Sequence, residues 1–480
     1  MKNKKKIVLT GGGTGGHLYP VIAMAEEVKR KNKEVEFLFI GIKGRAEEKV
    51  VPSLGYPIKF VLAEGFPRQK KPITFLRFFF KTTLGTLMAA YYLLKFKPSL
   101  IISTGGYTSA PVIFANAFLS KTGLIKAKSF IHEQNAIPGK LNLLASKLVD
   151  CIGVTFPQTL SFFPQKKSYL VGYPVRRDIG KKDKKEARDI LGIKQDSRVL
   201  LIIGGSLGSK TINHAIVNAL PKLMEKENVV VIHQTGNSPK YNGYKDTIKL
   251  LKKKGWQKLP DRYHPLEYIK DIDLYYAASD LVICRGGSGT LHEIMASSLP
   301  SIIIPKPGLP GDHQAMNALE LKKKRVAKII YEEISFKNGK SEMAVNPRLL
   351  AEKSLTLLFN DKKKTEMSKR AKELFVSNPI DKIGDILQSL LNGSFPENHN
   401  KFSFYESYKP SLINLEGNSL INALEEMEKD GKLNLLSQDE LKYLKYKADG
   451  YLMSERWQTR NNGVKLVGLT KYEKRISFLL

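Results

Sequence analysis

The sequence predicts an α/β protein made of two doubly wound, Rossmann-like domains followed by a helical extension. Short β-rich apolar runs alternate with longer helical stretches, which is typical of βαβ units whose parallel strands are covered on both faces. A glycine-rich turn between a strand and a helix occurs at 11–16, and the same arrangement returns at 204–209. Because the pattern restarts, we expect two domains of the same class.

The length of the chain, 480 residues, exceeds what one hydrophobic core usually organises. Turn residues meet a run of charges near Pro174, so we place a first domain at 1–174 and a second at 175–370. The stretch 396–480 follows a Gly/Pro/Asn-rich linker and contains helical patterns without another glycine turn. It is predicted to be an appended helical module of undefined role.

The net charge of +32 indicates an anionic partner: a phosphate-bearing substrate, an acidic membrane surface or a nucleic acid. The stretch 68–97 interleaves lysine and arginine with many aromatic residues. Such a surface fits anionic headgroups, with its rings in the membrane interface. RNA stacking is the alternative, and we favour the membrane because no RNA-binding motif accompanies the stretch.

The apolar and sulfur-containing residues limit the class of protein further. Cys151 and Cys284 both lie in strand-like runs, which argues against a disulfide framework and fits a reducing compartment. The longest apolar run, 84–94, is shorter than the about 20 residues of a membrane-spanning helix. The N-terminus lacks the pattern of a signal peptide.

The first glycine turn lies in the stretch GGGTGGHLYP at 11–20. Three of its glycines satisfy the dinucleotide fingerprint GxGxxG, but the next strand ends in Gly41, where that fingerprint needs an acidic residue. A P-loop would have Lys and then Ser or Thr where this chain has His17 and Leu18. A dinucleotide cofactor and a nucleoside triphosphate are therefore both disfavoured as ligands. The turn is instead predicted to offer its unpaired backbone N–H groups, at a helix N-terminus, to a phosphate. A purely structural turn is the alternative.

His17 is the titratable side chain within this turn. The reference pKa of histidine suits general-base work near neutral pH. We predict a catalytic or substrate-orienting role for His17, with an ordinary hydrogen-bonded polar residue as the alternative.

Two further glycine turns precede helices in the second domain, GGSLGS at 204–209 and CRGGSGTLHE at 284–293. The hydroxyls of Ser206, Ser288 and Thr290 can join backbone N–H groups in binding a diphosphate. Glu293 is then either a carboxylate for the two ribose hydroxyls or the partner of Thr290 in a capping box.

Polar residues also gather where two strands end, at 132–135 (HEQN) and at 312–314 (DHQ). Open α/β sheets bind ligands at the carboxyl ends of their strands. Both clusters are candidate ligand contacts, and the second has enough hydrogen-bonding groups to recognise a sugar. Solvated surface is the alternative for each.

Together these motifs resemble one known family. GGTGGHLYP, GGY at 105–107, HEQNAIPGKLN, GYPVR, GGSLGSKTIN, CRGGSGTLHEI and DHQAMNAL occur in the order and spacing of the MurG family, over about residues 5 to 392. These bacterial transferases add N-acetylglucosamine to a lipid-linked muramoyl pentapeptide. The resemblance implies a GT-B fold, in which two Rossmann-like domains face each other across a cleft and a helix near 378–392 returns to the first domain.

The resemblance also implies positions for the two substrates. UDP-N-acetylglucosamine is the expected donor, with no tightly bound cofactor and no metal. The residues expected to bind it are Ser206 and Thr290 (diphosphate), Glu293 (ribose), the backbone at Ile269 (uracil), His313 and Gln314 (sugar), and also Thr14, Gly15, Gly16, Asn135 and Arg176. The residues expected at the acceptor are Gly13, Thr14, Gly15, Gly16, His17 and Tyr107.

The implied reaction is an inverting transfer of N-acetylglucosamine to the 4-hydroxyl of undecaprenyl-diphospho-muramoyl pentapeptide (lipid I). The product, lipid II, serves peptidoglycan synthesis. The enzyme would be peripheral on the cytoplasmic face of the bacterial plasma membrane, with His17 as the candidate base, other cell-wall synthesis or division proteins as candidate partners, and no nucleic acid. The alternatives are a diacylglycerol glycosyltransferase, an isomerase of the UDP-N-acetylglucosamine 2-epimerase type, and a catalytically silent scaffold.

Overall fold

The computed structural model describes residues 4–13, 15–67, 72–205, 207–238, 241–308, 310–337, 340–397, 417–429, 433, 436–454, 457–470 and 472. The chain divides into two compact units. Unit 1 is Met1–Arg177 with Val376–Ser407, and unit 2 is Asp178–Phe375 with Tyr408–Leu480. The division thus follows Arg177 rather than Pro174, and the described helices of the extension belong to unit 2.

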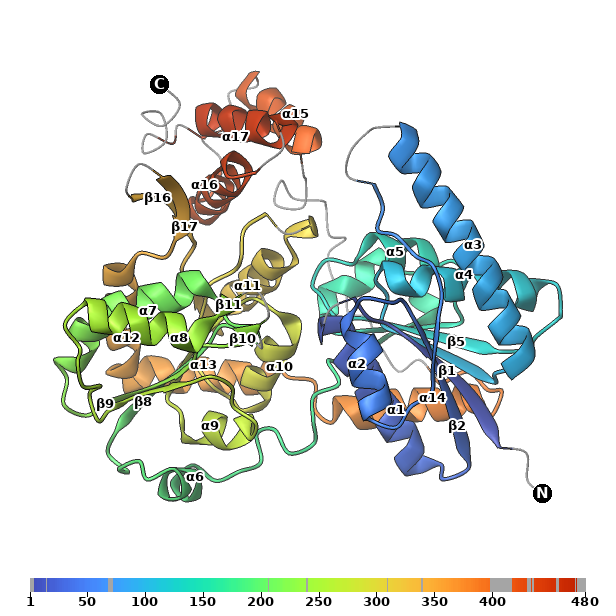
Figure 1. Cartoon of the computed structure of the whole chain (residues 1–480), viewed down its shortest axis with the longest axis horizontal. Helices are drawn as coiled ribbons and strands as arrows, with labels where there is room; N and C mark the ends of the chain where they lie inside the picture. The colour runs from blue at the N-terminus through green and yellow to red at the C-terminus, as the bar shows by residue number, and fades with distance from the viewer. Residues whose placement is uncertain are drawn as a thin grey trace. The chain divides into compact units, whose positions relative to one another are not determined.

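Unit 1 is built on a seven-stranded parallel sheet in the order β3-β2-β1-β4-β5-β6-β7. Its strands are continuous apolar runs because helices cover both faces of the sheet (Figure 1). The order reverses between β1 and β4, and the carboxyl ends of these two strands form the switch point, where such sheets bind ligands. The strands are β1 (Lys5–Thr10), β2 (Val35–Gly41), β3 (Ile58–Phe60), β4 (Leu100–Ser103), β5 (Lys128–Glu133), β6 (Cys151–Val154) and β7 (Ser168–Leu170).

The helices of unit 1 include one from far along the chain. Helix α14 packs beside α1, and its Ile383 and Leu387 join the same buried cluster as Leu18 (Figure 1). Arg177 adds ion pairs to Glu27 of α1 and Asp381 of α14. The helices are α1 (Gly15–Lys31), α2 (Ala46–Ser53), α3 (Pro72–Phe96), α4 (Ala110–Lys121), α5 (Lys140–Ala145) and α14 (Pro379–Leu391), with the short 3-10 helices η1 (Tyr107–Ser109), η2 (Pro157–Phe162) and η3 (Gln165–Lys167).

Unit 2 repeats the design with a six-stranded parallel sheet in the order β12-β9-β8-β13-β14-β15, and its switch point lies between β8 and β13. Its strands are β8 (Arg198–Ile203), β9 (Val229–Gln234), β12 (Tyr263–Leu266), β13 (Leu281–Cys284), β14 (Ser301–Ile303) and β15 (Ala327–Ile329), with two small hairpins, β10 (Asn237–Ser238) with β11 (Tyr241–Asn242) and β16 (Glu333–Lys337) with β17 (Lys340–Ala344). Its helices up to residue 375 are α6 (Lys184–Ile190), α7 (Lys210–Met224), α8 (Gly243–Lys253), α9 (Ile272–Ala278), α10 (Ser288–Ala296), α11 (His313–Lys323), α12 (Pro347–Leu358) and α13 (Asp361–Leu374), with η4 (Pro310–Asp312) before α11.

The extension contributes three described helices, α15 (Gly417–Lys429), α16 (Gln438–Leu452) and α17 (Trp457–Leu469). They share a small apolar core with Ile334 of β16, so they rest on the hairpin of unit 2 (Figure 1). The buried members from the extension are Leu420, Ile421, Leu424, Leu444, Ala448, Leu452, Leu466, Val467 and Tyr472.

The predicted fold class is confirmed, since both units have doubly wound parallel sheets. Cys151 and Cys284 are buried free thiols in β6 and β13. Among the described helices, none is both long enough and apolar enough to cross a membrane.

One fully buried histidine in each sheet gives the fold a pH dependence. Burial lowers the pKa of His132 to about 4 and that of His233 to about 3. Because the unfolded chain binds these protons first as the pH falls, the stabilisation is complete above about pH 6.5 and is lost from there towards the folded pKa. For His132 the full loss amounts to about 3 kcal/mol.

We therefore expect the midpoint of thermal unfolding to fall when the pH is lowered from 7 to 5. In the variant His132→Gln this fall should be smaller, because one histidine no longer contributes to the proton uptake. Scanning calorimetry at both pH values measures the difference. An unchanged pH dependence in His132→Gln would show that the histidine does not stay neutral in the fold.

Candidate functional site

The glycine turn of unit 1 lies at the switch point, against the end of β4. Gly11 follows β1 with a φ of +152°, and a Cβ there would lie 2.0 Å from Oγ1 of Thr104, so no larger residue fits. That hydroxyl donates to the carbonyl of His17 at 2.7 Å. The first turn of α1 is therefore fixed to the strand on the other side of the switch point.

His17 lies in the first turn of α1, which begins at Gly15, and so it is part of the helix rather than of the preceding loop. Its Nδ1 is 2.8 Å from the carbonyl oxygen of Thr104. A carbonyl only accepts hydrogen bonds, so Nδ1 carries the hydrogen, and the lone pair of the neutral ring is at Nε2. The ring packs beside Gly106, whose added Cβ would lie 3.4 Å from Cδ2 of His17.

A buried carboxylate that the sequence prediction missed stabilises this turn through a hydrogen bond to its backbone. Glu47, in the first turn of α2, accepts a 3.0 Å hydrogen bond from the N–H of Gly13. A Cβ at Gly12 would lie 2.5 Å from the carboxyl carbon of Glu47. Since the N–H of Gly13 is used within the protein, the donors for an anion are those that the start of α1 leaves unpaired, near Gly15 and Gly16.

Tyr107 lies close to the same turn. A Cβ at Gly13 would be 3.7 Å from its ring, and the guanidinium of Arg45 is 6.0 Å from the ring centroid. The structure thus gathers five of the predicted residues at the carboxyl ends of β1 and β4, namely Gly13, Gly15, Gly16, His17 and Tyr107. Thr14 lies outside the described residues.

The polar cluster after β5 is organised by Glu133, which is buried. Its carboxylate accepts from the backbone N–H of Asn135 at 2.9 Å and of Gly139 at 3.0 Å, and from the side chain of Asn142 at 2.7 Å. Gln134 donates to the carbonyl of Thr104 at 3.0 Å, the oxygen that His17 also meets. Glu133 therefore shapes the loop, while Gln134 connects it to the glycine turn.

Arg176, the other residue of unit 1 predicted at the donor, has an exposed side chain.

At the switch point of unit 2, Arg285 joins the two glycine turns. Its Nη2 donates to the hydroxyls of Ser209 at 2.6 Å and Thr211 at 2.7 Å, and its Nη1 pairs with buried Glu332 at 2.6 Å. Ser209 also caps α7 by accepting from the N–H of Ile212. Sequence reasoning missed Arg285 and Glu332, and Ser206 lies outside the described residues.

Helix α10 begins at Ser288 with Gly287 as its N-cap, so Thr290 lies inside the helix. The capping box between Thr290 and Glu293 is therefore wrong. The carboxylate of Glu293 instead accepts a 3.0 Å hydrogen bond from the hydroxyl of Tyr276. The first turn of α10 and Glu293 are on one helix, so a helix N-terminus, which is a type of site suited to anions, lies near a carboxylate.

The remaining predicted donor contacts lie on the loop after β12 and in the first turn of α11. The N–H of Ile269 donates to Gln234 at 3.0 Å. Gln314 accepts from the N–H of Lys306 at 3.0 Å, and Nδ1 of His313 is buried without a hydrogen-bond partner among the described residues. A Cβ at Gly286 would lie 2.2 Å from the carbonyl of Gln314, so the start of α11 packs on the turn after β13.

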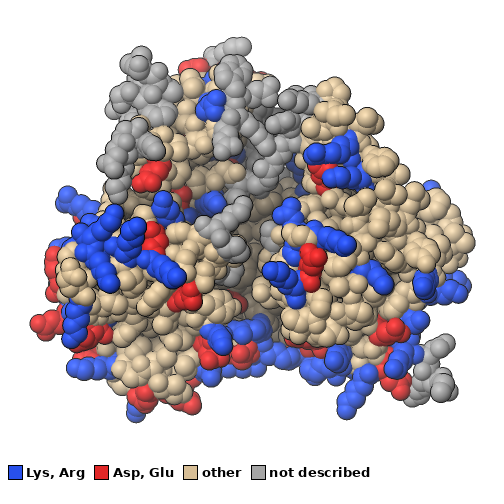
Figure 2. All heavy atoms as spheres, in the orientation of Figure 1, with Lys and Arg blue, Asp and Glu red and all other residues tan. Residues whose placement is uncertain are grey.

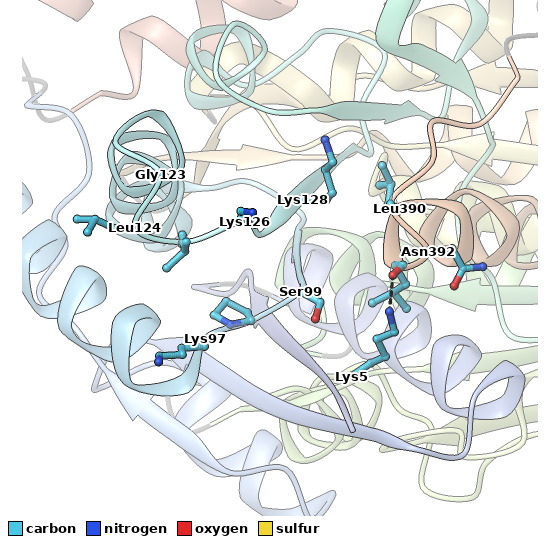
Figure 3. A pocket seen from close by; sticks show the side chains of 13 residues that line it. Lys5, Lys97, Ser99, Gly123, Leu124, Lys126, Lys128, Leu390 and Asn392 are labelled. Carbon is cyan, nitrogen blue, oxygen red and sulfur yellow. Dashed lines mark hydrogen bonds between the residues drawn. The ribbon is translucent and has the colours of Figure 1, made fainter. Parts of the chain in front are cut away.

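A separate hollow of about 540 Å³ opens in unit 1 at the opposite end of the strands, near the amino ends of β1, β4 and β5 (Figure 3). Four lysines line the hollow, namely Lys5, Lys97, Lys126 and Lys128.

The described residues contain no group of three His, Cys, Asp or Glu side chains suited to a metal ion.

Comparisons with known proteins agree with the two-unit division. The glycosyltransferase family 28 N-terminal domain matches residues 7–154, and the corresponding C-terminal domain matches residues 199–383. A UDP-N-acetylglucosamine–N-acetylmuramyl-(pentapeptide) pyrophosphoryl-undecaprenol N-acetylglucosamine transferase of Desulfitobacterium hafniense (strain Y51) is 36% identical over 68% of this chain and 86% of its own. The protein of the same name from Acetivibrio thermocellus is 33% identical over 80% and 98%. Among solved structures, MurG of Acinetobacter baumannii aligns with a TM-score of 0.61 at 24% identity, over 80% of this chain and 99% of its own.

Proposed function

The chain belongs to glycosyltransferase family 28, among the pyrophosphoryl-undecaprenol N-acetylglucosamine transferases, and we propose that it transfers N-acetylglucosamine from its UDP ester to lipid-linked muramoyl pentapeptide. The product is lipid II, the disaccharide precursor of peptidoglycan. One observation of the site carries the donor assignment most directly. A glycine turn, the N-terminus of α10 and the carboxylate of Glu293 follow one another at the switch point of unit 2.

The donor is assigned to unit 2. The diphosphate meets the first turn of α10 with Thr290, and the two ribose hydroxyls donate to Glu293. The backbone of Ile269 meets the uracil, and His313 with Gln314 meets the sugar. In unit 1, Asn135 and Arg176 are further donor contacts.

The acceptor diphosphate is assigned to the N-terminus of α1 in unit 1, beside Tyr107. The muramoyl 4-hydroxyl attacks the anomeric carbon from the face opposite UDP. A new C–O bond forms as the bond to UDP breaks, and UDP leaves with the electron pair. Nε2 of His17 takes the proton of the hydroxyl, and helix N-termini stabilise the charge that develops on UDP.

Transfer of labelled N-acetylglucosamine from UDP-N-acetylglucosamine tests this function directly. We expect product with a lipid-linked muramoyl diphosphate acceptor and none with diacylglycerol. Label found only on diacylglycerol, or only as a free epimerised sugar, would replace the proposal by one of the alternatives.

The lipid acceptor calls for a membrane surface, and α3 provides a candidate. Only Gly85, Ala89 and Leu93 of this helix are buried. Its outer side carries an apolar stripe about 30 Å long at helical spacing, over which the surface in Figure 2 is mostly tan with blue side chains near both ends. The stripe residues, 36% to 67% exposed, are Ile73, Leu76, Phe80, Leu84, Leu87, Tyr91 and Leu94.

An exposed apolar stripe of this length marks an interaction surface, and cations at its ends suit anionic lipids. Arg77 and Lys81 lie near one end, where both pair with Glu64. We assign the stripe to the cytoplasmic leaflet, with the protein bound peripherally. The predicted residues 68–71 lie outside the described part of the chain.

Glutamate on the stripe should weaken membrane binding. Phe80→Glu removes apolar burial worth about 1.5–3 kcal/mol and adds repulsion from anionic lipid, so we expect partitioning to phosphatidylglycerol vesicles to fall at least about tenfold. Vesicle sedimentation measures this partitioning. Ile190→Glu in α6 is the matched control, because Ile190 is 62% exposed and Phe80 is 66% exposed. Equal losses in the two variants would remove the stripe from the membrane contact.

A further inference from the structure

The extension contacts the loop that leads into α11, at the residue before His313. Asp312 has a left-handed φ of 41° and follows Gly311, which has a φ of 70°. A residue with a side chain holds this conformation only where surrounding contacts stabilise it. Asp312 is also buried, so its carboxylate needs partners.

Helix α16 supplies those partners. Nζ of Lys447 is 3.1 Å from Oδ2 of Asp312, and the side chains of the pair are 2% and 7% exposed. The hydroxyl of Tyr443 donates to the same oxygen at 3.2 Å and accepts from Lys447 at 3.2 Å. Burial raises the pKa of Tyr443 well above its usual value, so the hydroxyl stays a neutral donor.

The same face of α16 also reaches the beginning of the loop. Gly450 lies two turns beyond Tyr443, and a Cβ on it would be 3.0 Å from the side chain of Pro307 and 3.4 Å from the backbone nitrogen of Gly308. Glycine at this position therefore lets the helix approach the loop closely. The described part of the loop is held by α16 at both of its ends.

The other side of the loop is connected to the turn that follows β13. Gln314 accepts from Lys306, and Asn317 donates to the carbonyl of Gly286 at 3.1 Å. A continuous series of contacts thus runs from α16 through Asp312 and the start of α11 to the glycine turn after β13. The extension therefore stabilises the loop that leads into α11, and the two predicted sugar contacts are the first two residues of that helix.

We propose that Lys447 and Tyr443 are positioning residues of the donor site, which hold Asp312 so that His313 and Gln314 meet the N-acetylglucosamine. This inference rests on the proposed function, because it assigns the sugar of the donor to these two residues. The uridine diphosphate is assigned to α10 and the loop of Ile269, which have other supports. Loss of the contact should therefore weaken recognition of the sugar more than that of the nucleotide.

Lys447→Met in the full chain tests the proposal. We expect the KM for UDP-N-acetylglucosamine to rise at least tenfold, with a smaller change in kcat and an inhibition constant for UDP within twofold of the unaltered protein. Lys442→Met is the matched control, because Lys442 lies on the same helix and is exposed. Tyr443→Phe removes one hydroxyl and serves as the second variant if Lys447→Met does not fold, since breaking a buried pair is strongly destabilising.

A double-mutant cycle checks that the effect passes through Asp312. If it does, Asp312→Asn combined with Lys447→Met raises the KM no more than the stronger single change, because both remove one interaction. Donor affinities equal to that of Lys442→Met in both Lys447→Met and Tyr443→Phe would overturn the proposal. An unaltered protein that fails to bind UDP-N-acetylglucosamine in calorimetry would instead refute the proposed function.

Discussion

Replacing His17 with alanine should lower kcat for N-acetylglucosamine transfer by about 10²–10⁴-fold, the usual contribution of a positioned general base. The reason is the tautomer that the carbonyl of Thr104 imposes, which leaves the lone pair at Nε2. The KM for UDP-N-acetylglucosamine should stay within twofold, because His17 is not among the residues assigned to the donor. Initial rates at saturating donor and acceptor measure both parameters.

Two comparisons separate a base from a residue that only orients the acceptor. Imidazole added to His17→Ala should restore part of the rate if the missing group is a proton acceptor. In contrast, His17→Asn keeps a donor for the carbonyl of Thr104 but has no basic nitrogen, so it should be as slow as His17→Ala. A His17→Asn enzyme with nearly full turnover would remove His17 from proton transfer.

The fold class was predictable because its signals are local. Apolar strand runs, glycine turns and helical patterns repeat in an order that only doubly wound sheets explain, and the structure has two such sheets. The glycine turns were also predictable, since Gly11 and Gly286 lie where another backbone or side chain comes within van der Waals distance. Positions of such close approach need glycine because it has no Cβ, so they can be recognised in the sequence.

The supports of the site were not predictable, because they come from distant positions. Glu47 supports the glycine turn by accepting from the N–H of Gly13, but it lies in the helix that follows the second strand, 34 positions further along the chain. Lys447 contacts Asp312 from 135 positions away in the sequence, so no spacing rule connects them. The capping box, which was the alternative role for Glu293, was wrong because the helix begins at Ser288, two residues before Thr290.

The second large effect is expected at Glu293. A charged carboxylate that accepts from two ribose hydroxyls contributes about 1.5–3 kcal/mol for each bond, so Glu293→Ala should raise the KM for UDP-N-acetylglucosamine at least about 100-fold. The change should appear mainly in KM, because the ribose is bound equally in the ground and transition states. Steady-state kinetics with varied donor measure it.

A donor that lacks the ribose 2′-hydroxyl makes the assignment specific. The unaltered enzyme should discriminate against 2′-deoxy-UDP-N-acetylglucosamine, because the half-buried carboxylate of Glu293 then loses one of its two ribose donors, whereas Glu293→Ala should use the two donors almost equally. Tyr276→Phe should cause a smaller loss of the same kind, since the Tyr276 hydroxyl orients the carboxylate at 3.0 Å. If Glu293→Ala lowers the unfolding temperature but still discriminates between the donors, Glu293 stabilises α10 and another group binds the ribose.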